Sequence, residues 1–332
     1  MCIRDRPYNG SHADFVHVIR HELVHAFMFD MAFGARGDLG RRQFFHIPLW
    51  FAEGMAEWFS SGWDAEADMF LRDATINDYI WPLERVGGFL VYKEGQAAVR
   101  LLDERYGSNK LVEFWRRVGQ TRSVERALHS VYGLDHEELN RLFAHEMRRR
   151  YWTQYADREQ IREIARPLTD HRAEQAFYNG RPALSPDGDA QVYFSDREGL
   201  VDLYLMSAID GRIIRRLGRS QRSSRFESFH SFRSGISFAP SGDEIALVAK
   251  SGNEETLHTI DGRNGDITRS LKLGFDVLAS PAWSPDGDAI VVIGTKLGRT
   301  DLYLVDLSGR DATRFAAPGR VEVPGPAETT IL

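Results

Sequence analysis

Ser185-Pro186-Asp187-Gly188-Asp189-Ala190 is repeated as Ser284-Pro285-Asp286-Gly287-Asp288-Ala289, so the two copies start 99 residues apart. At the same offset Asp202-Leu203-Tyr204-Leu205 recurs as Asp301-Leu302-Tyr303-Leu304, and Ala239-Pro240-Ser241-Gly242-Asp243 lies between the copies. Proline presets φ for a type I turn, glycine closes that turn, and the alternating apolar run after each turn predicts a strand. The repeating unit is therefore about half of 99 residues, within the length range of a four-stranded propeller blade.

These repeats resemble the TolB-type β-propeller repeat, over most of residues 182–310. The chain from residue 165 onward consists of short apolar runs bounded by Asp-Gly, Ser-Gly and Pro, a texture that predicts strands and tight turns. Only about three blades are visible, whereas closed propellers have about 4–8. We therefore expect an incomplete, all-β propeller domain over residues 168–332. An unrelated β-sandwich with Pro-Gly turns is the alternative.

The first half of the chain has the pattern of a helical domain. Apolar residues recur at helical spacing between residues 11 and about 160, for example in Leu111-Val112-Glu113-Phe114-Trp115. Asp135 followed by Glu138 resembles a capping box, and helices are expected to end at the glycines at 62, 107 and 133. We predict a multidomain protein, with a mainly-α domain at residues 7–160 joined through the charged segment Gln160 to Ala176.

Composition bounds the class of protein. The 332 residues carry a net charge of −6 and are 42% hydrophobic, which favours folded domains and argues against a general nucleic-acid binder. The single cysteine, Cys2, allows neither an internal disulfide nor a cysteine zinc cage. No apolar run approaches the ~20 residues that would span a bilayer. The start, residues 1–6, resembles translated sequencing-adapter read-through, so we expect a fragment truncated at both ends.

His21-Glu22-Leu23-Val24-His25 matches the H-E-x-x-H pattern of zinc hydrolases in full. Four residues make about one helical turn, so both imidazoles lie on one face and can reach one metal ion. Glu22 projects about 100° away, where it can address a water without binding the metal. Apolar flanking residues, among them Ile19 and Phe27, agree with a buried helix. Two ordinary histidines on a helix are the alternative.

A catalytic zinc ion usually takes three protein ligands, so a third is needed from a neighbouring element. The best candidate is Glu53, in the apolar, predicted helix that follows Pro48. Glu57 lies four residues further on the same helix face, and two like charges there require compensation. Zinc on Glu53 and a histidine N–H on Glu57 would compensate both. His17, one turn before His21, and His46 are competing histidines, expected to have packing, second-sphere or loop roles.

At these residues the chain resembles the gluzincin, or MA-like, zinc metallopeptidases. The matching pieces are the His21–His25 motif and Trp50-Phe51-Ala52-Glu53-Gly54-Met55-Ala56-Glu57, and the resemblance extends over about residues 12–150. It implies that Glu53 is the third zinc ligand and that Glu57 orients the first histidine. It also implies amide hydrolysis by a metal-activated water, with Glu22 as general base. Tyr92 is the expected oxyanion donor, and Tyr79 is the second choice.

Two functions remain open at this stage. In the first, the chain is a zinc peptidase that acts on a peptide or protein, and its propeller is a docking or gating platform. In the alternative, a non-catalytic propeller binds a protein partner and the peptidase-like half is a zinc-stabilised or inactive scaffold. A serine peptidase finds no support, because there is no Gly-x-Ser-x-Gly nucleophile elbow. By family resemblance we expect an exported protein, periplasmic or extracellular.

Overall fold

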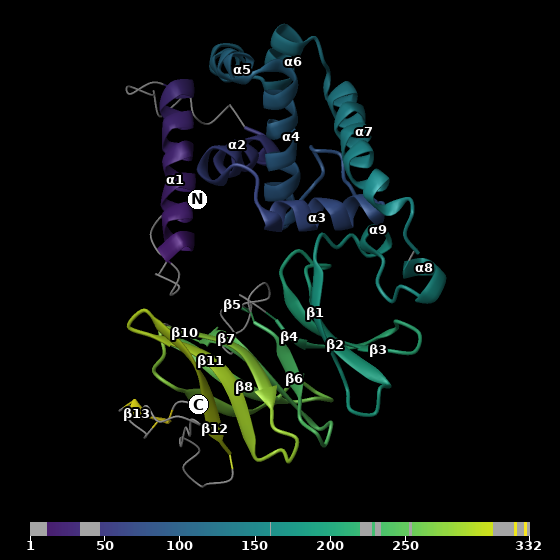
Figure 1. The fold of residues 1–332 in the computed structure, drawn as a ribbon, viewed down its shortest axis with the longest axis vertical. Coiled ribbons are helices and arrows are strands. Elements are labelled where there is room, and N and C mark those ends of the chain that lie inside the picture. The colour runs from purple at the N-terminus through teal and green to yellow at the C-terminus, as the bar shows by residue number, and fades with distance from the viewer. Residues whose placement is uncertain are drawn as a thin grey trace. The chain divides into compact units, whose positions relative to one another are not determined.

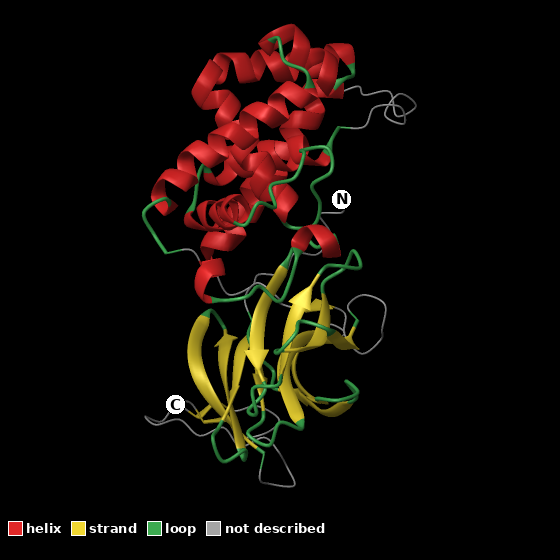
Figure 2. Cartoon of the chain, turned by 90° about the vertical axis from the view of Figure 1, so that its right-hand side faces the viewer, coloured by secondary structure: helices red, strands yellow, loops and turns green. Residues whose placement is uncertain are grey.

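The computed structural model describes residues 12–33, 47–159, 161–219, 228–229, 234–251, 254–307, 322–323 and 329–330. The chain forms two compact units that meet in sequence between Arg166 and Pro167. The long helices belong to the first unit and the strands to the second (Figure 2). A mainly-α part followed by antiparallel sheets agrees with the predicted fold class at this coarse level, while the predicted domain bounds remain predictions.

The helical unit is built around one central helix. Its elements are α1 (His12–Phe33), α2 (Leu49–Ser61), α3 (Ala65–Ile76), α4 (Leu90–Tyr106), α5 (Ser108–Thr121), α6 (Val124–Tyr132), α7 (His136–Tyr155) and α8 (Ile161–Ile164). Helix α4 packs against α2, α3, α5 and α7 (Figure 1). The predicted glycine stops are confirmed, because residues 62, 107 and 133 cap the C-termini of α2, α4 and α6. The capping box of Asp135 and Glu138 at the start of α7 is also confirmed.

Two glycines bring α2 and α4 into backbone contact. A Cβ atom on Gly54 would lie 2.3 Å from the carbonyl carbon of Gly95, and one on Gly95 would lie 2.1 Å from the carbonyl oxygen of Trp50. No side chain fits at either position without moving a helix. Glycine is therefore required at position 54 by the close packing of α2 on α4. The same contact brings the residues around Gly54 close to those around Gly95.

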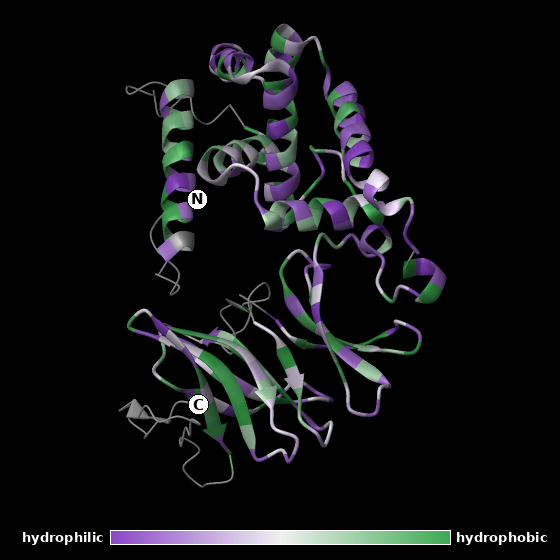
Figure 3. Ribbon diagram, in the orientation of Figure 1, coloured by the Kyte–Doolittle hydropathy of each residue, from purple (hydrophilic) through white to green (hydrophobic). Residues whose placement is uncertain are grey.

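The prediction of a buried H-E-x-x-H helix holds for one face only, in the part of the chain that the structure describes. Helix α1 packs against α2 and α5, and this covers only part of its circumference. Ile19, Leu23 and Phe27 recur at four-residue intervals and are 44%, 50% and 65% exposed. Hydrophobic and hydrophilic bands both occur along α1 (Figure 3). The apolar pattern gave the helical period correctly but could not tell which face a neighbour covers.

The second unit consists of antiparallel sheets. The first sheet runs β1-β2-β3-β4 and the third β10-β11-β12; the sheet between them runs β5-β7-β8-β9, with β6 also paired to β7. A short helix, α9 (His171–Glu174), precedes them. The strands are β1 (Asn179–Leu184), β2 (Ala190–Ser195), β3 (Asp202–Ser207), β4 (Ile213–Gly218), β5 (Ser228–Phe229), β6 (Ile236–Phe238), β7 (Glu244–Ser251), β8 (Glu254–Asp261), β9 (Ile267–Lys272), β10 (Val277–Trp283), β11 (Ala289–Lys296), β12 (Arg299–Asp306), β13 (Glu322–Val323) and β14 (Thr329–Thr330).

The repeated turns form as the sequence predicts. The amide of Gly188 donates to the carbonyl of Ser185 at 2.9 Å, and that of Gly287 donates to the carbonyl of Ser284 at 3.0 Å. Gly188 has φ +80° and Gly287 has φ +82°, values that favour glycine. Each turn leads directly into the second strand of its sheet. Chain neighbours thus pair within each sheet, which is compatible with propeller blades, although the described residues form no closed ring of sheets.

The sheets bury a continuous apolar cluster between them. It joins strands of the second and third sheets and includes Ala246, Val248, Leu257, Leu273, Phe275, Leu278, Ile290, Val292, Tyr303 and Val305. Most of its members lie on β7, β8, β10, β11 and β12, where every second residue of a strand points to the same side of the sheet. Among the helices that the structure describes, none is both long and apolar enough for a bilayer-spanning segment.

Candidate metal centre

Three side chains from two helices meet at one point of the helical unit. Nε2 of His21 lies 3.1 Å from Oε2 of Glu53, and Nε2 of His25 lies 3.2 Å from the same oxygen. The two Nε2 atoms are 3.1 Å apart. All three residues are buried, at 4–8% exposure. The structure therefore brings together the three residues that the sequence predicts as ligands. Glu53 follows His25 by 28 positions and His21 by 32 positions along the chain.

The donor set and its spacing fit a zinc ion. With bonds of about 2.0–2.1 Å in tetrahedral geometry, two ligand atoms stand about 3.3 Å apart, close to the three separations found here. Without a cation, hydrogen bonds cannot satisfy all three contacts, because the two ring nitrogens and the carboxylate oxygen are all acceptors unless a ring nitrogen carries a proton. Two imidazoles with one carboxylate are also a common ligand set of catalytic zinc. The residues present thus fit the ion that the sequence motif implies.

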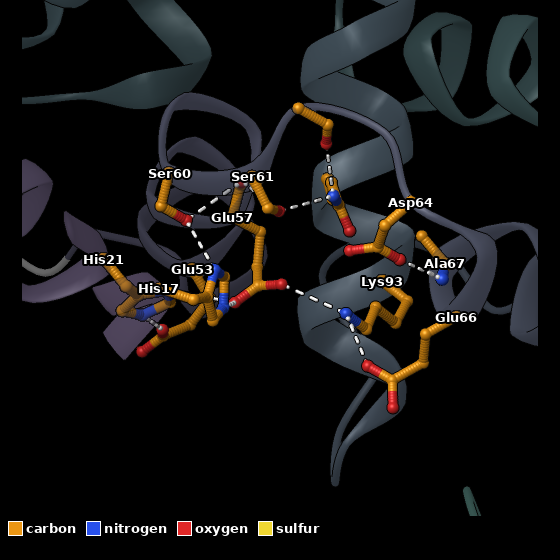
Figure 4. Close-up of polar contacts among 12 residues, drawn as sticks. His17, His21, Glu53, Glu57, Ser60, Ser61, Asp64, Glu66, Ala67 and Lys93 are labelled. Carbon is orange, nitrogen blue, oxygen red and sulfur yellow. Dashed lines mark hydrogen bonds and ion pairs between the residues drawn. The ribbon is translucent and has the colours of Figure 1, made fainter. Parts of the chain in front are cut away.

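Glu57 fixes the orientation of His21. Its Oε1 lies 2.9 Å from Nδ1 of His21, and Figure 4 shows this carboxylate between α1 and α4. A charged carboxylate only accepts hydrogen bonds, so Nδ1 carries a proton, and Nε2 is the ring atom that faces Glu53 and would bind a metal ion. Such outer-sphere carboxylates hold the tautomer and ring orientation of metal ligands. His25 lacks this support, because its buried Nδ1 has no hydrogen-bond partner in the described part of the chain.

The electrostatics of the cluster favour a bound positive charge. Burial alone would lower the pKa of His21, but hydrogen bonds to Glu53 and Glu57 outweigh it and raise this pKa to about 9. Burial would raise the pKa of Glu53, yet its contacts with His21 and His25 lower it to about 2. The pKa of Glu57 is likewise lowered, against burial, by His17, His21 and Lys93. Both carboxylates therefore stay charged in spite of their burial, and they favour a positive charge at the ring nitrogens that face them.

His17 belongs to the same network without joining the three ligand atoms. Its Nε2 lies 3.4 Å from Oε1 of Glu57, and its Nδ1 lies 3.4 Å from the hydroxyl of Ser60. Ligand atoms of His17, His21 and Glu57 also lie within 4.8 Å of one another, the spacing of a second group of metal-binding side chains. However, Glu57 already faces the ammonium of Lys93 at 3.1 Å, which supplies positive charge at that place. His17 therefore contacts Glu57 and is not expected to bind a metal ion itself.

The remaining predicted residues are placed as follows. Glu22 is partly exposed and follows His21 on α1, about 100° further round the helix. The ring of Tyr92 lies 6.1 Å from that of His21, centroid to centroid, so α4 brings it beside the cluster. Tyr79 is buried, and its hydroxyl donates a hydrogen bond to the nearby Asp73. His46 lies outside the described residues.

Sequence reasoning missed Lys93. This residue is buried on α4, next to Tyr92, and its Nζ lies 3.1 Å from Oε2 of Glu57. Neither the spacing nor the family resemblance gave it a role. The sequence offered little signal, because Lys93 is followed by the polar residues Glu94 and Gln96, and only its burial shows that its charge needs a partner. The identity of that partner depends on the contact at Gly54 and Gly95, which no local pattern encodes.

Comparison with known proteins adds information on part of the chain. No family model matches it. It is 30% identical over 136 residues to a TolB homolog of Chlorobium luteolum, a stretch that makes up 40% of this chain and 27% of that protein. The chain thus spans about a quarter of the length of this curated relative.

Solved structures of similar proteins carry the same name. TolB from Acinetobacter baumannii is 18% identical with a TM-score of 0.34, and the match covers 44% of this chain and 34% of that one. A putative TolB from Agrobacterium tumefaciens is 19% identical with a TM-score of 0.31, covering 41% and 46%. The sequence match to the TolB homolog supports the TolB-type resemblance of the propeller-like part, and none of these comparisons supports the gluzincin resemblance.

Proposed function

We propose that the helical unit holds a zinc ion on His21, His25 and Glu53 and hydrolyses peptide bonds. The observation that carries this proposal is the convergence of two ring nitrogens and one carboxylate oxygen at 3.1–3.2 Å. A buried cluster of this kind is costly to keep without a cation. The adjacent glutamate of the H-E-x-x-H motif favours a catalytic role, since a purely structural metal site has no need of a base.

The residues of this chain divide the chemistry among them. When bound, zinc would supply Lewis acidity and would lower the pKa of water to about 7. Glu22, next to His21, accepts a proton from the attacking water and returns it to the leaving amine. Glu57 keeps His21 in one tautomer. Tyr92, beside His21, is the proposed hydrogen-bond donor to the oxyanion. The substrate is a peptide or protein, and an exported location belongs to the same proposal.

A second candidate is favoured by the comparisons, because the similarity that they find is to TolB. In this candidate the propeller-like unit binds a protein partner and the helical unit is a scaffold without peptidase activity, with or without zinc. The sheet unit can also serve the first candidate, as a platform that docks or gates substrate.

One experiment separates the candidates. The purified full chain is analysed for metal by mass spectrometry and is incubated with a mixed peptide library, with and without a chelator. The first candidate predicts about one zinc per chain and cleavage that the chelator abolishes. Zinc without cleavage would favour the scaffold, and a chain that binds no zinc would overturn the metal centre itself.

A further inference from the structure

Lys93 is a buried cation held between two carboxylates. Its side chain is 4% exposed, and Nζ lies 3.1 Å from Oε2 of Glu57 on α2 and 3.1 Å from Oε2 of Glu66 on α3 (Figure 4). The ring of Phe89 lies 5.4 Å from the same Nζ, a cation–π distance. Burial would lower the pKa of Lys93, but Glu57 and Glu66 outweigh it and raise this pKa. The ammonium is therefore charged and its direction is fixed.

Both oxygens of Glu57 are in use. Oε1 accepts from Nδ1 of His21 at 2.9 Å, while Oε2 accepts from Lys93 at 3.1 Å. A carboxylate held at both oxygens has lost its rotation about the last side-chain bond. The ring of His21, in turn, presents Nε2 to Glu53 at 3.1 Å. Two groups, Glu57 and His21, thus link Lys93 to the proposed ion in a continuous chain of contacts.

A structural role alone is a weak reason for this arrangement. Replacing a buried ion pair by well-packed apolar residues is often neutral or stabilising, so burial of an ammonium needs another explanation. The contact of α2 and α4 at Gly54 and Gly95 places Lys93 where it reaches Glu57. The other partner, Glu66, is 51% exposed and contributes little on its own.

We propose that Lys93 is a positioning residue of the metal centre, which clamps Glu57 so that this carboxylate orients His21 toward the ion. The proposal rests on the proposed function, since it requires that His21 bind zinc. Lys93 does not touch substrate or metal. Its effect passes through Glu57, and the loss of such outer-sphere partners typically costs about 10–100-fold in metal affinity.

The test measures zinc affinity by chelator competition in the full chain, together with the d–d absorption of the cobalt-substituted protein. Lys93→Met removes the ammonium and keeps much of the side-chain volume, and we expect affinity to fall by about 10-fold and the cobalt spectrum to shift. Lys93→Arg keeps the charge and should recover part of the affinity. Lys110→Met, which breaks the exposed pair of Lys110 with Glu113 in the same unit, controls for loss of a charge.

A double-mutant cycle with Glu57→Gln decides whether the effect passes through Glu57. We expect Lys93→Met to change zinc affinity much less when Glu57→Gln is already present. Equal affinity and an unchanged cobalt spectrum in Lys93→Met, with zinc still bound by the unaltered chain, would overturn the role of Lys93 alone. No zinc binding by the unaltered chain would overturn the metal centre and this inference together. Metal-free thermal unfolding of each variant identifies any that fails to fold, in which case Lys93→Arg carries the test.

Discussion

The two units bury polar groups in different ways. In the sheet unit, buried or partly buried polar side chains recur at equivalent places: Ser185 contacts Asp187 as Ser284 contacts Asp286, and in each case the serine hydroxyl accepts from a backbone amide. In the helical unit, buried charged side chains gather around His21 and Glu57, and the described helices carry no second buried cluster of this kind. Repeated polar contacts serve a repeated fold, whereas a single buried cluster of charge requires a ligand or a function to explain it.

If the charged cluster of the helical unit is catalytic, the largest loss of activity is expected from Glu22→Gln. Because Glu22 is the proposed base, peptide cleavage should fall by about 10²–10⁴-fold, while bound zinc stays near the level of the unaltered chain. Cleavage rate and metal content are measured on the same preparation. Unchanged cleavage would remove Glu22 as the base and would weaken the case that the cluster is catalytic.

The next effect concerns the third ligand. Glu53→Ala removes the only carboxylate among the three proposed ligands. Loss of a residue that only supports a ligand lowers metal affinity by about 10–100-fold, and we expect a larger fall in zinc affinity here. Titration against a chelator gives the affinity. Glu113→Ala, which removes an exposed glutamate of α5, is the matched control and should leave affinity unchanged. Full zinc occupancy in Glu53→Ala would move the third ligand elsewhere.

A pH effect is expected in the sheet unit, away from the cluster. Burial lowers the pKa of His258 to about 4, so its neutral form is favoured in the folded state. In the unfolded chain His258 takes up a proton near pH 6.5, whereas in the folded chain it stays neutral until about pH 4. The free energy of unfolding should therefore fall by on the order of 3 kcal/mol as the pH is lowered from 6.5 to 4. Hydrogen exchange at the amides of β8 reports it.

His258→Asn is the matched variant for that pH effect. It keeps a polar group near the hydroxyl of Ser270, which now lies 3.0 Å from Nδ1 of His258, and it carries no titrating group. The fall in protection between pH 6.5 and 4 should be smaller in this variant. A pH dependence identical to that of the unaltered chain would show that other groups cause it.

The smallest expected effect tests how the helical unit positions its cluster. In an ordinary helix interior, Gly→Ala is stabilising by about 1 kcal/mol. Gly54→Ala should instead destabilise the unit by about 1–3 kcal/mol, because the new methyl group would overlap Gly95, and it should weaken zinc binding as α2 and α4 separate. Chemical denaturation gives the first quantity and chelator competition the second. A stabilised variant would contradict the close contact.

What the sequence predicts well is local. The glycine stops of α2, α4 and α6, the capping box of α7 and the repeated turns each depend on a few neighbouring residues, and each forms as predicted. The ligand set was within reach because H-E-x-x-H fixes two atoms on one helix. The exposure of Leu23 and Phe27 and the contact of Lys93 with Glu57 were not, because they depend on which helix packs where.

The proposed zinc ion has three protein ligands, His21, His25 and Glu53. X-ray absorption at the zinc edge of the zinc-loaded full chain tests it most directly, with His21→Ala measured beside it. We expect nitrogen and oxygen ligands at about 2.0–2.2 Å, with the scattering pattern of two imidazoles, and loss of one imidazole or of the ion in the variant. A chain that binds no zinc, or a spectrum that His21→Ala leaves unchanged, would contradict it.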